Sequence, residues 1–222
     1  MISVAIDGPA GAGKSTIARS AAQELGFIYV DTGALYRAIG LFAHENGIAD
    51  TDEQALVSRL GEINIELDYR DGQQLIFLNG RDVSEEIRRP QMSMAASNVS
   101  ALPGVRDFLL DLQREMARRY NVIMDGRDIG TVVLPGADLK IFLTADVEER
   151  AMRRYIEFTT KGEGVRYEEV LEDIKRRDEN DSRRAAAPLR CADDAILLDT
   201  TGNELEDSIA LVIKTIRERG IG

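Results

Sequence analysis

A glycine-rich segment near the N-terminus carries the strongest chemical signal in the sequence. Gly8, Gly13, Lys14 and Ser15 satisfy the pattern Gly-x-x-x-x-Gly-Lys-Ser, between a short apolar run and a helical pattern. Glycines allow backbone angles that turn successive N–H groups inward, so such a loop can hold phosphate. The helix that follows adds the positive end of its dipole. The alternative is a glycine-rich turn without a ligand, but both flanking elements favour a nucleoside triphosphate site.

The expected nucleotide site extends from this loop to an acid on a later strand. Lys14 is expected to reach the β- and γ-phosphates, and the Ser15 hydroxyl to ligate Mg²⁺. Asp125 ends an apolar run, where an acid either supports Mg²⁺ or caps the next turn. The predicted metal ligands are therefore Ser15 and Asp125. The predicted ATP-binding residues are Gly8, Pro9, Ala10, Gly11, Ala12, Gly13, Lys14, Ser15 and Thr16.

A charged cluster late in the chain could bind a second phosphate. Arg177, Asp181 and Arg184 are spaced i, i+4 and i+7, so one helix face would present two guanidinium groups and a carboxylate. A guanidinium binds phosphate through two parallel hydrogen bonds and stays charged at any working pH. The alternative is that Asp173–Arg177 and Glu179–Arg183 are surface ion pairs, each worth roughly a few tenths of a kcal/mol.

Arg150, Arg153 and Arg154 form a third group of cations. They are either a solvated helix face or part of a lid that brings arginines to the transferring phosphoryl group, whose spread negative charge they would stabilise. No general base is obvious, and transfer onto an already ionised phosphate needs none. The sequence contains no Asn-Lys-x-Asp motif, which argues against a GTPase.

An alternation of strands and helices must position these residues. Apolar runs predict strands at 2–7, 27–30, 121–125, 139–143 and 195–198. Helical spacing predicts helices at 15–25, 34–44, 147–159, 167–183 and 205–219, with further helical stretches from 90 to 119. Gly26 is placed to end the first helix, and Thr51 with Gln54 has capping-box spacing for a helix to about residue 60. Five strands linked by helices predict a parallel sheet with right-handed crossovers.

The segment from 63 to 80 departs from this alternation. Apolar residues from Ile63 to Tyr69 alternate with polar ones, which is the period of a half-exposed strand. Asp71-Gly72 and Asn79-Gly80 are hairpin signals. We therefore predict a small antiparallel meander that forms an inserted subdomain.

Composition limits the class of protein. The chain has 222 residues, which allows one α/β core with an insertion or two small domains. A net charge of −11 argues against a nucleic-acid polymer as partner, whereas the local arginines suit small phosphorylated ligands. No apolar stretch approaches the roughly 20 residues that span a bilayer, and the N-terminus does not resemble a signal peptide. One cysteine excludes an internal disulfide, and one histidine with one cysteine cannot build a structural zinc site. We expect a cytoplasmic monomer.

Five stretches resemble the bacterial cytidylate kinases, a family within the nucleoside monophosphate kinases. They are residues 6–14, 31–37, 125–133, 140–143 and 184–189, and the similarity extends over essentially the whole chain. The phosphate loop alone indicates only a superfamily. The runs Asp-Thr-Gly-Ala-x-Tyr-Arg and Asp-Gly-Arg-Asp-x-Gly-Thr-Val-Val are much more specific.

The resemblance implies transfer of the γ-phosphoryl group of ATP to CMP or dCMP with Mg²⁺, giving ADP and CDP or dCDP. It implies one α/β domain with a five-stranded parallel sheet flanked by helices. The core would lie at about 1–36, 100–152 and 167–222, the monophosphate-binding insert at about 37–99 and a short helical lid at about 153–166. Two alternatives stay open: a kinase of another small acceptor such as UMP, and a nucleotide-binding switch that transfers nothing.

The resemblance also implies roles for individual residues. Thr32, Arg106, Asp128 and Arg184 would read the cytosine; Ser97, Arg177 and Asp181 would meet the sugar; Arg37, Arg127 and Arg177 would hold the acceptor phosphate. The expected catalytic residues are Lys14, Arg127, Asp128, Arg154 and Arg177. A carboxylate such as Asp128 can accept a hydrogen bond from the cytosine amino group, while arginines donate to the acceptor edge. Uracil has no amino donor, so it should fit less well.

Overall fold

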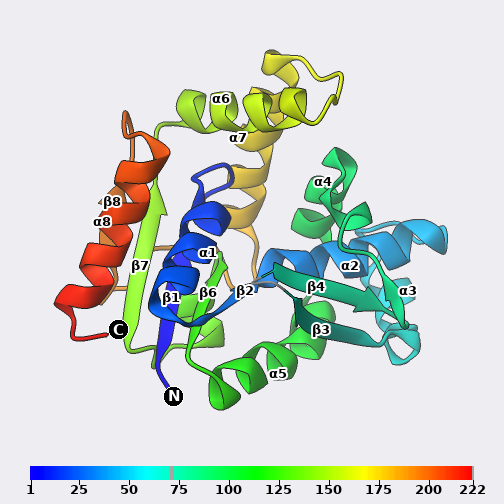
Figure 1. Ribbon diagram of the computed structural model, residues 1–222. Helices are drawn as coiled ribbons and strands as arrows, with labels where there is room; N and C mark the ends of the chain where they lie inside the picture. Colours follow the sequence, from blue (N-terminus) through cyan, green and yellow to red (C-terminus); the bar gives the residue numbers. More distant parts are fainter. Residues whose placement is uncertain (71–72, 222) are drawn as a thin grey trace.

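Five parallel strands form the central sheet, in the order β2-β6-β1-β7-β8 (Figure 1). The computed structural model describes residues 1–70 and 73–221. The strands are β1 (Ser3–Asp7), β2 (Ile28–Asp31), β6 (Val122–Gly126), β7 (Leu139–Thr144) and β8 (Ile196–Asp199). The predicted parallel sheet is therefore confirmed. Because the strands are parallel, their carboxyl ends meet at one edge, which is where open α/β sheets bind ligands.

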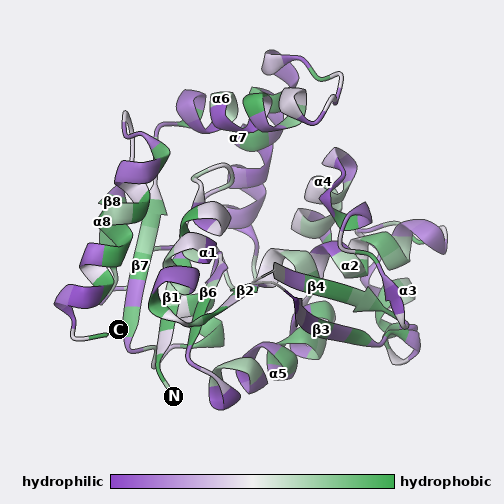
Figure 2. Cartoon of the chain, viewed as in Figure 1, coloured by the Kyte–Doolittle hydropathy of each residue, from purple (hydrophilic) through white to green (hydrophobic). Residues whose placement is uncertain are grey.

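Helices cover both faces of this sheet. On one face, α1 (Lys14–Leu25) and α8 (Leu205–Glu218) pack on alternate residues of β1 and β7, among them Val4, Ile6 and Ile141. On the other face, α5 (Pro103–Arg119) and the π-helical segment Ile129–Val133 cover Ala5 and Met124. Figure 2 shows hydrophobic residues along β6 and most of β7, as strands buried on both faces require.

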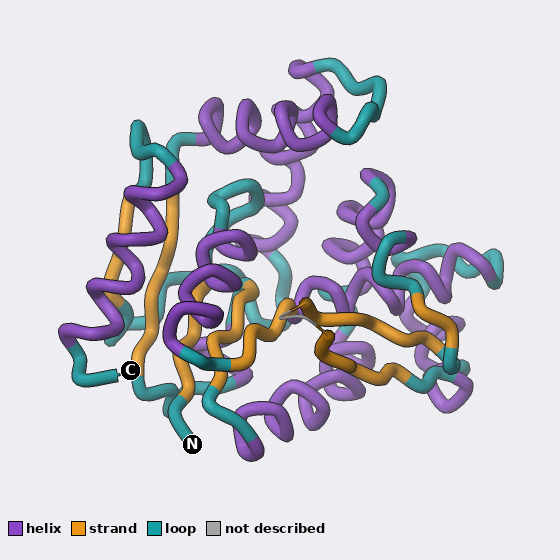
Figure 3. Tube along the Cα trace, viewed as in Figure 1, coloured by secondary structure: helices purple, strands orange, loops and turns teal. Residues whose placement is uncertain are grey.

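A second, antiparallel sheet lies beside the β2 edge (Figure 3). It consists of β3 (Ile65–Arg70), β4 (Gln73–Leu78) and β5 (Arg81–Asp82), which confirms the predicted meander. Asn79 and Gly80 have φ values of 51° and 79°, as a tight hairpin turn requires at both central positions. The predicted turn at Asp71 and Gly72 lies outside the described residues.

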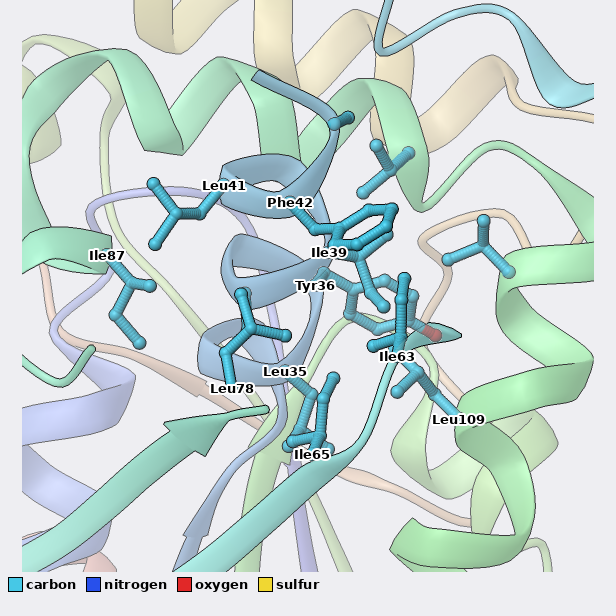
Figure 4. Packing of buried hydrophobic residues seen from close by; sticks show 14 of the residues in the cluster. Leu35, Tyr36, Ile39, Leu41, Phe42, Ile63, Ile65, Leu78, Ile87 and Leu109 are labelled. Atoms are coloured by element: carbon cyan, nitrogen blue, oxygen red, sulfur yellow. The ribbon is translucent and has the colours of Figure 1, made fainter. Parts of the chain in front are cut away.

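One helix joins the meander to the central sheet. The helix α2 (Thr32–Glu45) packs Leu35 and Ile39 against Ile65 and Leu78 of the meander and Leu109 of α5 (Figure 4). Around it lie the short helices α3 (Glu53–Val57) and α4 (Pro90–Val99) and the 3₁₀ turns Leu60–Glu62 and Glu86–Arg88. The meander thus shares one hydrophobic core with α2 and α5.

The helices α6 (Val147–Thr160) and α7 (Tyr167–Arg183) pack on each other beyond the carboxyl ends of the strands (Figure 1). Both were predicted from helical spacing, to within a residue at each end. In the part of the chain that the structure describes, no helix combines the length and apolar character needed to cross a membrane.

One local prediction needs correction, and one segment was missed. The helix expected from Thr51 to about residue 60 is instead the short α3 followed by a separate 3₁₀ turn. Its N-cap is Asp52, whose carboxylate accepts from the Ala55 N–H at 3.0 Å, rather than Thr51 with Gln54. A carboxylate is a strong N-cap, and its negative charge is stabilised by the positive end of the helix dipole. The helix therefore starts one residue later than predicted. The π-helical segment Ile129–Val133 was not predicted at all.

Candidate active site

The phosphate loop runs from the end of β1 to the start of α1. Gly8 passes so close to β7 that a Cβ atom there would lie 1.9 Å from the Leu143 carbonyl oxygen. At Gly11, where φ is 74°, a Cβ would lie 2.8 Å from the Arg150 carbonyl oxygen. The loop is therefore enclosed by the central sheet and α6, and its glycines are required by close approach as well as by backbone angle.

Lys14 is buried at the first turn of α1. Its ammonium group donates to the Pro9 carbonyl oxygen at 2.7 Å, across the loop. Burial lowers the pKa of Lys14 and the Arg127 guanidinium lowers it further, while Asp125 and Asp7 act in the opposite direction. A phosphate group beside this buried cation would supply counter-charge.

The two predicted metal ligands are in direct contact. The Ser15 hydroxyl donates to one oxygen of Asp125 at 2.9 Å, and the Tyr29 hydroxyl donates to the other at 2.9 Å. Burial raises the pKa of Asp125 to about 6, and the negative charge of Asp31 contributes. A hydroxyl and a carboxylate are hard oxygen donors, and Mg²⁺ in kinases takes one or two such ligands besides phosphates. The residues present therefore fit Mg²⁺. Tyr29 was missed because it reads as an ordinary strand residue.

Asp128 lies between two buried arginines. It forms ion pairs with Arg106 and with Arg184, the latter at 3.2 Å. Arg106 lies over the Tyr36 ring at 5.6 Å, and Arg184 also donates to the Ser100 hydroxyl at 2.9 Å. The family resemblance implied that these three charged residues share a site, and the structure places them in contact. Tyr36 and Ser100 were not predicted.

The turn that carries Asp128 is fixed by a carboxylate of the first strand. Asp7 accepts from the Ile129 and Gly130 N–H groups at 2.8 and 2.7 Å, at the start of the π-helical segment. Burial raises the pKa of Asp7 to about 6 although both hydrogen bonds favour the ionised form. The signal available in the sequence was its place directly before the phosphate loop.

Asp181 is the centre of a second buried cluster. It pairs with Arg127 at 2.8 Å and accepts from the Ser97 hydroxyl at 3.1 Å. Burial would raise the pKa of Asp181, but Arg127, Arg177 and Arg184 together hold it below its usual value. The cluster carries more positive than negative charge, as an anion site requires.

Arg177 lies near this cluster and has an unused hydrogen-bond donor. Its buried Nε has no partner among the described residues, and burial together with Arg127 lowers its pKa to about 10. The surface-pair alternative is wrong for this residue, because Asp173 pairs with Arg176 at 3.1 Å. It is correct for Glu179 and Arg183, which pair at 2.5 Å on the exposed side of α7.

Thr32 and Arg37 lie at opposite ends of the first turn and a half of α2. The Thr32 hydroxyl donates to the Asp125 carbonyl oxygen at 2.7 Å, so it is engaged with the end of β6. Arg37 pairs with Asp31 at 2.7 Å, and its buried Nε is unpartnered in the described part of the chain. Asp31 also caps α2 by accepting from the Ala34 N–H at 2.9 Å.

The three arginines of α6 differ from one another. Arg150 is buried, pairs with Asp178 at 2.7 Å and donates to the Ala10 carbonyl oxygen at 2.7 Å, so the solvated-face alternative is wrong for it. Arg153 instead holds Glu149 and the Thr200 carbonyl. Arg154 pairs with Glu157 at 2.5 Å, reaches the Ser93 hydroxyl at 3.2 Å and lies over the Phe158 ring. Arg150 thus ties the phosphate loop to α7, while Arg154 lies nearest the insert.

These contacts place two kinds of anion site at one edge of the sheet. The phosphate loop, Lys14 and the Ser15–Asp125 pair form one. The arginine clusters around Asp128 and Asp181 form the other, between α7, α4 and the carboxyl end of β6 (Figure 1). The charges of the two groups of residues are of the kind that binds phosphorylated ligands.

Known proteins resemble this chain along nearly its whole length. The family model described as "Cytidylate kinase" matches residues 4–218. The chain is 52% identical over 213 residues to "Cytidylate kinase" of Caldicellulosiruptor bescii, covering 96% of this chain and 94% of the relative. It is 52% identical over 221 residues to "Cytidylate kinase" of Caldanaerobacter subterraneus subsp. tengcongensis, covering 100% and 97%. The crystal structure of an uncharacterized protein from Eubacterium ventriosum superposes with a TM-score of 0.54 at 12% identity, covering 98% of this chain and 99% of that one, and supports the fold alone.

Proposed function

Because the chain belongs to the cytidylate kinase family, we propose that it transfers the γ-phosphoryl group of ATP to CMP or dCMP, giving ADP and CDP or dCDP. The observation that supports this most directly is the pairing of a phosphate loop with a second, arginine-lined site at the same sheet edge. A switch that only binds ATP needs no second anion site.

The donor half of the site consists of the phosphate loop and Lys14. Backbone N–H groups of the phosphate loop, from Gly11 to Thr16, hold the phosphates of ATP, and the Lys14 ammonium moves from the Pro9 carbonyl to the β- and γ-phosphates. Ser15 and Asp125 hold Mg²⁺, which neutralises charge on the phosphate oxygens when it is bound. Tyr29 keeps the Asp125 carboxylate oriented toward Ser15.

The acceptor half holds the phosphate of CMP with Arg37, Arg127 and Arg177. The unpartnered Nε atoms of Arg37 and Arg177 are donors for its oxygens. An acceptor oxygen forms the new bond to the γ-phosphorus while the bond to the bridging oxygen of ADP breaks. The acceptor phosphate is already ionised, so no base removes a proton and catalysis consists of positioning and charge neutralisation. Arg154 joins from α6 by exchanging Glu157 for the transferring group.

The base is read by Asp128 with Arg106, Arg184 and Thr32. Two guanidinium groups pair with the Asp128 carboxylate and orient it, and its oxygens accept from the cytosine amino group. Uracil presents a carbonyl oxygen there and would leave the carboxylate facing an acceptor, at a cost of about 1–3 kcal/mol. Ser97 and Asp181 meet the sugar, on the side of the acceptor phosphate.

The proposed roles divide the chain into a core, a monophosphate-binding insert and a lid. Residues at about 37–99 form the monophosphate-binding insert, those at about 153–166 the lid and the remainder the core. Closure of the insert and the lid over both substrates would exclude water from the reaction. A monomeric state and a cytoplasmic location stay predictions.

Acceptor-dependent ADP formation tests this function. With ATP and Mg²⁺, we expect ADP release only when CMP is present, and a return to background when EDTA removes the metal. A nucleotide-binding switch would bind ATP without forming ADP in response to any monophosphate. Equilibrium binding of ATP without CMP-dependent ADP would therefore contradict the proposal.

A further inference from the structure

A glutamine of the meander bonds to the edge of the central sheet. Gln74 lies on β4 and is almost fully buried. Its side-chain oxygen accepts from the Asp31 backbone N–H at 2.9 Å, and its side-chain nitrogen donates to the Asp31 carbonyl oxygen at 3.3 Å. One amide side chain thus pairs with both backbone groups of one residue, as a neighbouring strand would.

Asp31 has no other strand to provide these bonds. It is the last residue of β2, and β2 is the outermost strand of the sheet on this side. An edge strand presents unpaired N–H and C=O groups, which are costly when they are buried. Gln74 satisfies the Asp31 N–H and adds a second donor to the Asp31 carbonyl, which as the N-cap of α2 also accepts the first hydrogen bond of that helix. It thereby fixes the backbone at the junction of β2 and α2.

The Asp31 side chain links this fixed backbone to Arg37, a residue of the proposed acceptor site. One of its oxygens caps α2 at the Ala34 N–H, 2.9 Å away, and the other pairs with Arg37 at 2.7 Å. Gly33 lies close to both side chains, since a Cβ there would lie 3.1 Å from an Arg37 nitrogen and 3.2 Å from an Asp31 oxygen. A shift of the Asp31 backbone would displace the carboxylate that pairs with Arg37.

We propose that Gln74 is a positioning residue for the acceptor phosphate: it holds Asp31, and through Asp31 it aims Arg37. This inference rests on the proposed function, in which Arg37 binds the phosphate of CMP. It also links the meander to the core by a polar contact. The phosphate loop makes no hydrogen bond to Gln74 among the described residues, and Asp31 acts on Asp125 of the donor half only through its charge, so the main effect is expected at the acceptor.

The test is a Gln74→Met variant, which keeps the length of the side chain and removes both hydrogen bonds. We expect the KM for CMP to rise about tenfold, with kcat within about threefold and the KM for ATP within about twofold. If Gln74→Met folds poorly, Gln74→Asn is the second variant to measure. Its amide is one methylene too short to reach Asp31, so it should give the same pattern. Circular dichroism and thermal midpoints report whether each variant is folded.

Ile76→Val is the matched control. Ile76 lies on the same buried side of β4, and the change loosens packing there without touching a polar contact. A merely structural role for Gln74 predicts that both variants lower the thermal midpoint and leave the KM for CMP unchanged, which would overturn the proposal.

A double-mutant cycle with Arg37→Ala tests the route. If Gln74 acts through Arg37, Gln74→Met should lower kcat/KM for CMP about tenfold in the wild-type background and less than twofold in the Arg37→Ala background. Equal losses in both backgrounds would show that Gln74 acts by another path. The wild-type assay separates this outcome from failure of the proposed function, because a wild-type protein without CMP-dependent ADP formation refutes that function first.

Discussion

Replacing Lys14 with methionine lowers kcat for phosphoryl transfer by about a thousandfold or more and leaves the protein folded. The Lys14 ammonium group is buried and donates to the Pro9 carbonyl, within the loop itself. We therefore expect its main role to be the stabilisation of negative charge on the transferring phosphoryl group. Steady-state ADP release with saturating CMP and ATP measures the effect.

The Lys14→Met variant should be at least as stable as the wild-type protein. Burial lowers the pKa of Lys14, so the ionised form is penalised in the folded state near neutral pH. Methionine keeps the stem and removes the charge, so the thermal midpoint should stay unchanged or rise. Lys214→Met is the control, since Lys214 lies on the exposed side of α8 and should leave kcat unaltered. Turnover above a tenth of wild type in the Lys14 variant would overturn the assignment of the phosphate loop.

Replacing Asp128 with alanine should abolish discrimination between acceptors. We expect kcat/KM for CMP to fall about a hundredfold and that for UMP to change little, with the KM for ATP within about threefold. The reason is that the carboxylate accepts from the cytosine amino group and has no favourable partner on uracil. Parallel titrations of CMP, UMP and ATP provide the three constants.

The same change leaves two buried arginines without their shared carboxylate. Breaking a buried ion pair costs about 3–5 kcal/mol, so Asp128→Ala also lowers the free energy of unfolding. Asp128→Asn loses the charge but keeps an acceptor oxygen, so it isolates the loss of the ion pairs from the loss of the acceptor. Asp173→Ala, at an exposed pair with Arg176, is the surface control. An unchanged preference for CMP in folded Asp128→Ala protein would remove this residue from the base site.

Much of this architecture could be predicted because its signals are local. The strand and helix patterns depend on periods of two and 3.6 residues, and α6 and α7 were placed to within a residue. The phosphate loop is one continuous segment, so its residues need no tertiary information. The Asp128 cluster was reached through motif resemblance, since no spacing rule joins Arg106, Asp128 and Arg184.

The parts that could not be predicted depend on contacts between distant residues. Asp7 accepts from the backbone of Ile129 and Gly130, Asp178 and Arg150 bond to the backbone of Ala10 in the phosphate loop, and Gln74 bonds to the backbone of Asp31. Each of these bonds involves the backbone, which presents the same groups at nearly every residue, so the partner's residue type gives no signal in the sequence. Arg184 was predicted to lie on the same helix face as Arg177 and Asp181. In the structure α7 ends at Arg183, and Arg184 pairs with Asp128 just beyond the end of the helix.

The central claim is that this site pairs ATP with a cytosine monophosphate, and kcat/KM for CMP, dCMP and UMP under identical conditions tests it most directly. The account predicts efficient transfer to CMP or dCMP and a value for UMP that is lower by about ten- to a hundredfold. Equal values for CMP and UMP would contradict the assignment of Asp128 and its two arginines as the base-reading group.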